Sequence, residues 1–335
     1  MRKKKRHRHH EQKNSFTKKI NTILSLLCLA IFLPVLLTIL YQKMQLEELL
    51  GNNTLTAIEQ ISTEQPEGEN ATELIQPGTE TISQVEKENA EKRLPGIVAK
   101  EISISAPDAC IKAQSIIART NLFAAMEDGT SEPAGMSIEE LRELWGDNFQ
   151  TIYERLEQLC TETEGKTLQY QNRYIYAAYH AISAGTTRNM SELYAEADMP
   201  YLSGVACHED TTASEYLTVN YWEMDPFLEK CRQSFPDAGI ESMESIQTKT
   251  KDSAGYVLEM QLGQTTCTGE EFRNLLGLPS AHFSITEIDG SVRIVTMGLG
   301  HGLGLSQYTA EKMAEAGEEY EKILEYFYPG VSIAE

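Results

Sequence analysis

The feature that most constrains this chain is an uncharged apolar stretch, residues 20–41, directly after a strongly basic segment. Residues 1–19 hold nine Lys or Arg and one Glu, a net charge of +8. The stretch is long enough to span a bilayer as a helix, and it lacks the cleavage site of a signal peptide. Because basic flanks stay cytoplasmic, we expect a cytoplasmic head, a single-pass signal anchor and an extracytoplasmic remainder. A buried soluble helix is disfavoured, since it would carry a polar face.

The composition predicts two further parts beyond the apolar stretch. Residues 42–94 contain no aromatic residue, eleven Glu and four Lys or Arg. Such a segment cannot bury enough apolar surface to fold, so we expect an acidic flexible stalk, followed by one folded domain over residues 95–335. Residues 20–335 carry 20 basic and 49 acidic side chains, a net charge of −29. This charge repels phosphate groups and excludes nucleic acid as a partner.

The cysteines and glycines give no sign of a metal or a cofactor. No C-x-x-C pair occurs, and five cysteines beyond the apolar stretch allow at most two disulfides and one thiol, with buried thiols as the simpler expectation. Cys207 and His208 are too few for a metal site. The glycine-rich run 300–304 lacks the lysine of a phosphate-binding loop. We therefore expect no metal, nucleotide or other cofactor.

The periodicity and turn signals predict an α+β domain. Ser105 is the expected N-cap of its first helix, with Asp108 closing a capping box. Asp289-Gly290 is a tight turn between two strands. The expected helices cover residues 105–123, 137–144, 146–160, 306–316 and 318–327, and the expected strands are a hairpin within 167–179 and the segments 256–262, 282–287 and 292–297.

Several segments, taken in order, resemble the stage II sporulation protein D / LytB family, and they span roughly residues 95–335. They are KAQSIIART (112–120), TEGKTL (163–168), AYHAISAGTT (178–187), PYLSGV (200–205), FRNLLGL (272–278), GHGLGLSQY (300–308) and YFYPGV (326–331). One such segment would be a weak signal, whereas this many in register form a specific one.

The resemblance implies a membrane-anchored protein of the peptidoglycan layer of a spore-forming bacterium. The sporulation branch is a lytic transglycosylase that cuts peptidoglycan glycan strands after an amidase has removed their peptides, during forespore engulfment. The other branch enhances an amidase. The expected partners are therefore glycan strands, a cell-wall amidase and a membrane partner of an engulfment complex. Two functions remain open: glycan cleavage of the transglycosylase type, or a non-catalytic glycan-binding or amidase-enhancing pseudo-enzyme.

The resemblance also places the family's catalytic Glu, the first residue of E-A-L-K-A-Q, at Ala109. Glu101 fits the Glu of the family's upstream E-M-P segment without a gap. Glycosidic cleavage needs a carboxylic acid that protonates the leaving oxygen, which alanine cannot supply. Asp108 is the nearest substitute. However, it is rotated by about 100° on the helix, and it has competing roles in the capping box and as an i,i+4 partner of Lys112.

The family segments further mark ten candidate saccharide-binding residues. For His301, Gln307 and Tyr308 we expect a saccharide-facing wall, although a structural His301 satisfied by the backbone is an alternative. The arginines could instead pair with acidic side chains, and His180, Ser183 and Gly185 could end a hairpin. The candidates are Lys112, Gln114, Arg119, His180, Ser183, Gly185, Arg273, His301, Gln307 and Tyr308.

Overall fold

A computed structural model of the chain describes residues 82–335. All of the described residues belong to one compact unit. The predicted basic head, membrane anchor and residues 42–81 of the predicted stalk lie outside the described residues. Within the described range, no helix is both long and apolar enough to cross a bilayer. Helices and sheets occur together, so the α+β prediction is confirmed.

The first described helix, α3 (Gln84–Glu101), corrects the predicted boundary of the stalk. It begins with a capping box between Ser83 and Glu86 and runs through Pro95. Its buried stripe packs against the next helix and consists of Ala90, Leu94, Ile97 and Val98. The prediction of a flexible stalk is therefore wrong for residues 84–94. A spacing of i, i+4, i+7 and i+8 makes one apolar face, which the acidic mean composition of the segment concealed.

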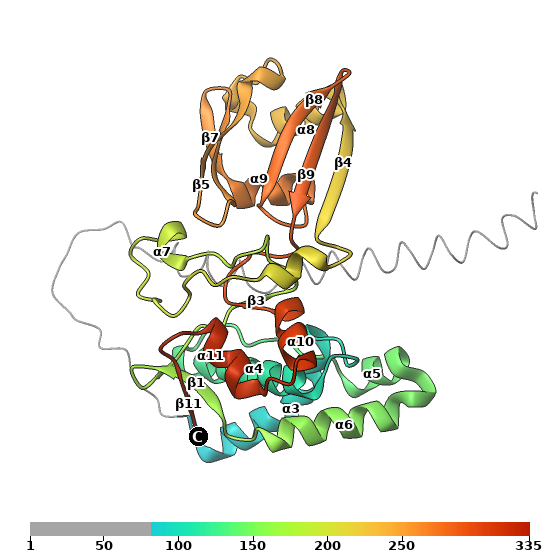
Figure 1. Ribbon diagram of the computed structural model, residues 1–335, viewed down its shortest axis with the longest axis vertical. Coiled ribbons are helices and arrows are strands. Elements are labelled where there is room, and N and C mark those ends of the chain that lie inside the picture. Colours follow the sequence, from blue (N-terminus) through green and yellow to red (C-terminus); the bar gives the residue numbers. More distant parts are fainter. Residues whose placement is uncertain (1–81) are drawn as a thin grey trace, which may run out of the picture. The chain divides into compact units, whose positions relative to one another are not determined.

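Helix α4 (Asp108–Asp128) is the centre of a helical group (Figure 1). Packed against it are α3, α6 (Phe149–Glu162), α10 (Gln307–Glu315) and α11 (Tyr320–Phe327). Because it is covered on several sides, thirteen of its side chains are buried. Helix α5 (Ile138–Trp145) starts with the predicted Ser137 cap and joins α6 through the 3-10 turn Gly146–Asn148.

The predicted capping box at the start of α4 does not form. The N-cap residue is Pro107, which makes no side-chain cap, and Ser105 Oγ lies 2.8 Å from Ser103 Oγ instead. The helix begins two residues later than predicted, so Asp108 is its first residue rather than the third. A carboxylate at that position cannot reach back to close a capping box.

Two small sheets adjoin the helical group. Strands β1 (Thr167–Tyr170) and β2 (Arg173–Tyr174) form the predicted hairpin, with β11 (Ser332–Ala334) on the other edge of β1. The second strand of the hairpin is shorter than predicted. The chain then leaves the sheet and forms β3 (Tyr179–His180), which pairs in parallel with β10 (Leu305–Ser306).

Two three-stranded sheets share a second core. One has the order β4 (Leu217–Glu223), β9 (Ser291–Met297), β8 (Phe283–Ile288); the other has β5 (Ile246–Lys251), β6 (Val257–Leu262), β7 (Thr265–Thr268). Helices α8 (Met224–Ser234) and α9 (Gly269–Leu276) contribute Phe227 and Phe272 to the core. The predicted strands and the Asp289-Gly290 turn are confirmed.

Short helical turns occupy the connections between these elements. They are α7 (Met190–Leu193) and the 3-10 turns His208–Thr212, Pro236–Ala238 and Met243–Ser245.

All five cysteines of the described range are free and buried. They are Cys110, Cys160, Cys207, Cys231 and Cys267. Burial raises the pKa of each thiol; that of Cys110 rises to about 12. The expectation of buried thiols is therefore confirmed, and residues 82–335 contain no disulfide.

Candidate functional site

Glu101, the last residue of α3, carries the carboxyl group whose surroundings best suit acid–base chemistry. The residue is half-buried. Its Oε2 accepts a hydrogen bond from Gln114 Nε2 at 3.0 Å, and its carboxyl group also bonds to the Tyr179 side chain. Desolvation outweighs these bonds and raises the pKa of Glu101 to about 7. A carboxyl group with such a pKa is populated in both protonation states near neutral pH.

The partners of Glu101 come from distant parts of the chain. Gln114 lies on α4, and Tyr179 lies on β3, which the parallel pairing with β10 fixes. Because successive strand residues point to opposite faces, Tyr179 faces Glu101 while His180 faces away. Burial and the nearby carboxyl raise the pKa of Tyr179 well above its usual value, so the phenol stays protonated and donates.

Gln307, the first residue of α10, completes the cluster. Its Nε2 donates to the Glu101 backbone carbonyl at 2.7 Å and to Gln114 Oε1 at 3.3 Å. The carbonyl of Glu101 is one of the unpaired groups that every helix leaves at its C-terminus, so this bond secures the end of α3 against α10. Of the predicted site residues, Gln114 and Gln307 are thus brought together.

Position 109 faces a different direction from the Glu101 cluster. Ala109 and Gln114 are five residues apart on α4, which separates them by about 140° around the helix axis. Gln114 faces Glu101, and Cys110 faces α10, whose Glu311 and Glu315 influence its pKa. A side chain at 109 therefore points away from Glu101.

Asp108 forms an ion pair with Arg155 of α6. Arg155 donates from its Nε to Asp108 Oδ1 at 3.0 Å, and its second terminal nitrogen also bonds that oxygen. The same guanidinium holds the carbonyls of Ile104 and Ala106. The side chain of Asp108 is 60% exposed. This pair fastens the loop before α4 to α6.

Lys112 and Arg119 make ion pairs within the helical group. Lys112 Nζ lies 2.6 Å from Glu162 Oε2, and this partner raises the lysine pKa while lowering that of Glu162. Arg119 is buried and binds Glu91 through two nitrogens, at 2.5 and 3.0 Å. It also donates to the carbonyls of Cys160 and Lys166. These contacts give both residues structural roles, and glycan binding by either remains a prediction.

His180 and His301 form a buried pair with ring centroids 5.8 Å apart. His180 Nδ1 lies 3.0 Å from the Leu303 carbonyl, whereas His301 Nδ1 accepts from the Leu303 N–H at 3.0 Å. Burial lowers the pKa of His180 to about 4 and that of His301 well below its usual value. Both rings are neutral, and each bonds the backbone through Nδ1, whereas the buried Nε2 atom of each ring has no hydrogen-bond partner within the described residues. The expected saccharide wall of His301, Gln307 and Tyr308 is not one exposed surface.

The glycine-rich run 300–304 lies beside these rings, and contacts within the protein require its glycines. Gly300 has φ 113°, and a Cβ there would lie 2.8 Å from His180 Cβ. Gly302 has φ 83°, and a Cβ there would lie 2.6 Å from the Tyr256 hydroxyl. Any larger residue would clash, so the close approach expected toward a ligand is made here to internal side chains.

Ser183 and Gly185 belong to a network around Asp210, which is fully buried. Asp210 accepts from the Ser183 N–H at 2.6 Å, and Ser183 Oγ accepts from the Gly185 N–H at 3.1 Å. Two hydroxyls of the first turn of α10 also bind this carboxylate, Ser306 Oγ at 2.8 Å and Thr309 Oγ1 at 2.6 Å. The network holds the segment of Ser183 and Gly185 and the turn that carries Asp210 against the start of α10.

The last two predicted residues lie apart from the Glu101 cluster. Tyr308 is half-buried, with its hydroxyl 3.2 Å from Thr212 Oγ1 and Lys312 over its ring. Arg273 is buried; it bonds Glu270 and the carbonyls of Leu278 and Pro279. Arg273 therefore secures the loop after α9, and its role toward a glycan remains a prediction.

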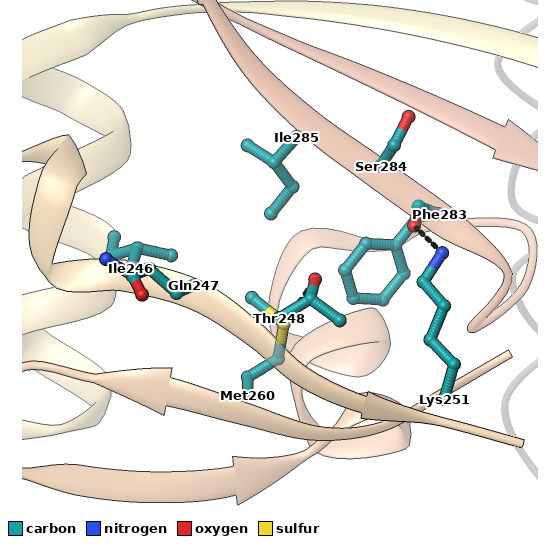
Figure 2. A pocket seen from close by; sticks show the side chains of 8 residues that line it. All are labelled: Ile246, Gln247, Thr248, Lys251, Met260, Phe283, Ser284 and Ile285. Carbon is teal, nitrogen blue, oxygen red and sulfur yellow. Dashed lines mark hydrogen bonds between the residues drawn. The ribbon is translucent and has the colours of Figure 1, made fainter.

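A pocket of about 410 Å³ opens between β5 and β8, and Figure 2 shows its lining. Lys251 Nζ bonds the Phe283 carbonyl at 3.3 Å across one side of it. None of the predicted site residues lines this pocket, whose residues are Ile246, Gln247, Thr248, Lys251, Met260, Phe283, Ser284 and Ile285. Over residues 82–335, no three His, Cys, Asp or Glu side chains are grouped closely enough to hold a metal ion.

Sequence reasoning missed Glu101 and Tyr179 as site residues. A signal for Glu101 was present, since it aligns with a family Glu and precedes a run rich in serine, which suits a helix end. No local signal marks Tyr179, because its role depends on the pairing of β3 with β10. The structure thus defines an α+β domain with a half-buried carboxyl group suited to proton transfer near neutral pH.

Comparison with known proteins gives the family. The family described as Stage II sporulation protein matches residues 78–170. The Stage II sporulation protein D of Bacillus amyloliquefaciens and that of Bacillus subtilis are each 28% identical to this chain over 95% of it and 96% of their own length. The amidase enhancer of Bacillus subtilis is 24% identical over 72% of this chain and 40% of its own length. The chain belongs to the stage II sporulation protein D family.

Proposed function

We propose that this protein remodels the cell wall during sporulation by cutting peptidoglycan glycan strands, with Glu101 as the proton donor. The single observation that carries the proposal is the Glu101 carboxyl group, with a pKa raised to about 7 and hydrogen bonds to Gln114 and Tyr179. The similarity to sporulation proteins and to an amidase enhancer supports the cell-wall role.

The proposed reaction is a lytic transglycosylation. The glycosidic bond between C1 of one sugar and the leaving oxygen breaks while the Glu101 carboxyl transfers its proton to that oxygen. The 6-hydroxyl oxygen of the same sugar bonds to C1, and its proton returns to the Glu101 carboxylate. No water is consumed, and the product carries a 1,6-anhydro end. One carboxyl group serves first as acid and then as base, which a pKa near the working pH favours.

Glu101 fits this role better than the positions that the sequence favoured. Ala109 has no titratable group and points away from the cluster. The side chain of Asp108 is largely exposed and is paired with Arg155 on α6, so it lies outside the Glu101 cluster. The proton donor in this chain is thus eight residues upstream of the position expected from E-A-L-K-A-Q.

We also propose that the protein is anchored in the cell membrane. The basic head and the apolar stretch of residues 20–41 support an anchored protein whose domain faces the wall, outside the cell membrane. In this arrangement the substrate is the wall next to the membrane, and an amidase that strips peptides is the natural partner enzyme.

A second candidate function is the non-catalytic enhancement of an amidase. The match to an amidase enhancer favours it, and so does a row of exposed apolar side chains along β4. Leu217 is 53% exposed, Val219 38% and Tyr221 67%. Exposed apolar rows of this kind are typical of protein-binding surfaces. Here the partner would be the amidase itself, and the Glu101 cluster would have no part in turnover.

One experiment separates these functions. The purified full chain is incubated with glycan strands free of peptide, and 1,6-anhydro ends are counted by mass spectrometry. Glu101→Gln keeps the shape and the hydrogen bonds of the protonated acid, and it should lower the rate about 10²–10⁴-fold. Asp108→Asn is the matched control and should remain active. If the wild-type chain releases no anhydro ends but accelerates a purified amidase, and Glu101→Gln does so equally, the second candidate is correct.

Ala109→Glu adds a further check on the assignment. If position 109 were the true site of the acid, this substitution would strongly raise the rate. With Glu101 as donor, the rate should change by less than about threefold, because the new carboxyl group points away from the cluster.

A further inference from the structure

The Gln307 side chain uses both of its amide protons within the site. A primary amide has two N–H donors and one carbonyl acceptor. The nitrogen of Gln307 contacts two acceptors, the Glu101 backbone carbonyl at 2.7 Å and Gln114 Oε1 at 3.3 Å. Neither donor bonds to the carboxylate itself, so any effect of Gln307 on the acid passes through these two groups.

The contact with Gln307 selects one orientation of the Gln114 amide. With Gln114 Oε1 turned toward the Gln307 donor, Gln114 Nε2 is turned toward Glu101, 3.0 Å from its Oε2. In the reversed orientation, two NH₂ groups would face each other and the Gln114 oxygen would face the carboxyl group. Two facing donors leave buried groups unsatisfied, which is costly. Gln307 therefore makes Gln114 a donor to Glu101.

Gln307 is itself held in place by the start of α10. The preceding residue, Ser306, is the N-cap of α10 and donates to the buried Asp210 carboxylate at 2.8 Å. Thr309 in the same turn donates to Asp210 at 2.6 Å. These two hydrogen bonds from hydroxyl groups to one buried carboxylate fix the first turn of α10. They thereby also fix the direction in which the Gln307 side chain points from the helix.

We infer that Gln307 is a positioning residue, which acts through Gln114 to present a hydrogen-bond donor to Glu101 during glycan cleavage. This inference rests on the proposed function of Glu101. A donor to a carboxylate stabilises the ionised form. Without Gln307 the Gln114 amide can turn its oxygen to Glu101, and the protonated form is then favoured. The acid should then release its proton to the leaving oxygen less readily, and its carboxylate should take up the proton of the 6-hydroxyl more readily in the second step.

The test measures the pH dependence of cleavage by the full chain in detergent. Gln307→Met removes both donors and keeps the length of the side chain. The alkaline limb of the kcat/KM profile should move up by about 0.5–1 pH unit, as expected for the loss of one hydrogen bond to a carboxylate. Gln114→Met should give a similar shift, and the double variant should shift no further. Gln158→Met, on the exposed face of α6, is the matched control and should leave the limb in place.

A uniform fall in rate with an unmoved alkaline limb would mean that Gln307 merely supports the fold, and it would overturn the inference. Additive shifts in the double variant would show that Gln307 does not act through Gln114. If Gln307→Met fails to fold, Gln307→Asn keeps a polar residue at the start of α10 while its amide falls short of Gln114, and it should show the same shift.

A second readout separates this inference from the proposed function. Carbon-13 labelling of the Glu side chains lets the Glu101 carboxyl signal, identified by its loss in Glu101→Gln, be titrated without substrate. If Glu101→Gln still cleaves glycan, the proposed function fails. The titration midpoint should nevertheless move up in Gln307→Met if Gln307 orients Gln114. An unmoved midpoint overturns the inference whatever the activity.

Discussion

Replacing Glu101 by glutamine should make the folded domain more stable at alkaline pH. The fold raises the pKa of this carboxyl from 4.5 to about 7. Below pH 4.5 the group is protonated in the folded and in the unfolded chain, so it costs nothing. Between pH 4.5 and 7 Glu101 is mostly ionised in the unfolded chain and mostly protonated in the folded domain. The folded domain therefore loses stability over this range, and the loss is complete once the pH has risen through 7. Glutamine imitates the protonated acid at every pH.

The expected gain follows from the size of the shift. A difference of about 2.5 pKa units at about 1.36 kcal/mol each gives an upper value of about 3 kcal/mol. Because Glu101 is half-buried and the carboxylate keeps its bond from Gln114, we expect about 1–3 kcal/mol at pH 8, where the group is ionised in both states. Near pH 4 the variant and the parent should be equally stable.

Urea unfolding of the 62–335 fragment from pH 4 to pH 8.5 measures this difference. This fragment contains every described core residue. Glu162→Gln is the control: Lys112 lowers the pKa of Glu162, so its removal should bring no gain at pH 8. Parallel stability curves for Glu101→Gln and the parent would refute the reasoning, because they would mean that the fold does not raise this pKa.

Four further outcomes are expected. Arg119→Met should destabilise the 62–335 fragment to urea by about 2–4 kcal/mol, because it leaves the half-buried Glu91 unpaired, and Glu91→Met in addition should restore much of the loss. Between pH 6.5 and 4 the parent should lose about 3 kcal/mol more stability than His180→Gln, since the unfolded histidine takes up a proton before the buried one does; equal slopes would contradict this. The five described thiols should react with a disulfide reagent only after unfolding, and fast reaction in the native fragment would show that they are not buried. External protease should remove the domain by cutting before Gln84 if the domain lies outside the membrane, and full protection would contradict the topology.

The elements that the sequence predicted well have a local chemical cause. The cap at Ser137 and the turn at Asp289-Gly290 each depend on residues within four positions of one another. Helix α3 was missed because a few buried apolar residues were averaged into an acidic composition. Strand β4 was missed although Leu217–Glu223 alternates, and in the structure the alternation presents Leu217, Val219 and Tyr221 to solvent rather than to a core.

Single residues of the site could be predicted from the sequence, but their arrangement around Glu101 could not. Gln114 and Gln307 were marked by family segments as binding residues, whereas their common partner Glu101 was aligned with a family Glu but given no role in the site. Glu101 is bonded by residues 13 and 206 positions away in the sequence, and its pKa depends on a desolvation that no local pattern reveals. The buried ion pair of Arg119 and the neutral histidines likewise depend on distant partners. Residue types could be read from the sequence, whereas protonation states required the fold.

Helix α3 is a rigid connection between the start of the described domain and the Glu101 carboxyl group. It has 18 residues, which correspond to about 27 Å, with Gln84 at one end and Glu101 at the other. Glu91, near its middle, is clamped to Arg119. A force that pulls on the chain before Gln84 would therefore act on the Glu91–Arg119 ion pair before it acted on Glu101. The hydrogen bonds around the carboxyl group would keep their geometry while the domain worked under tension.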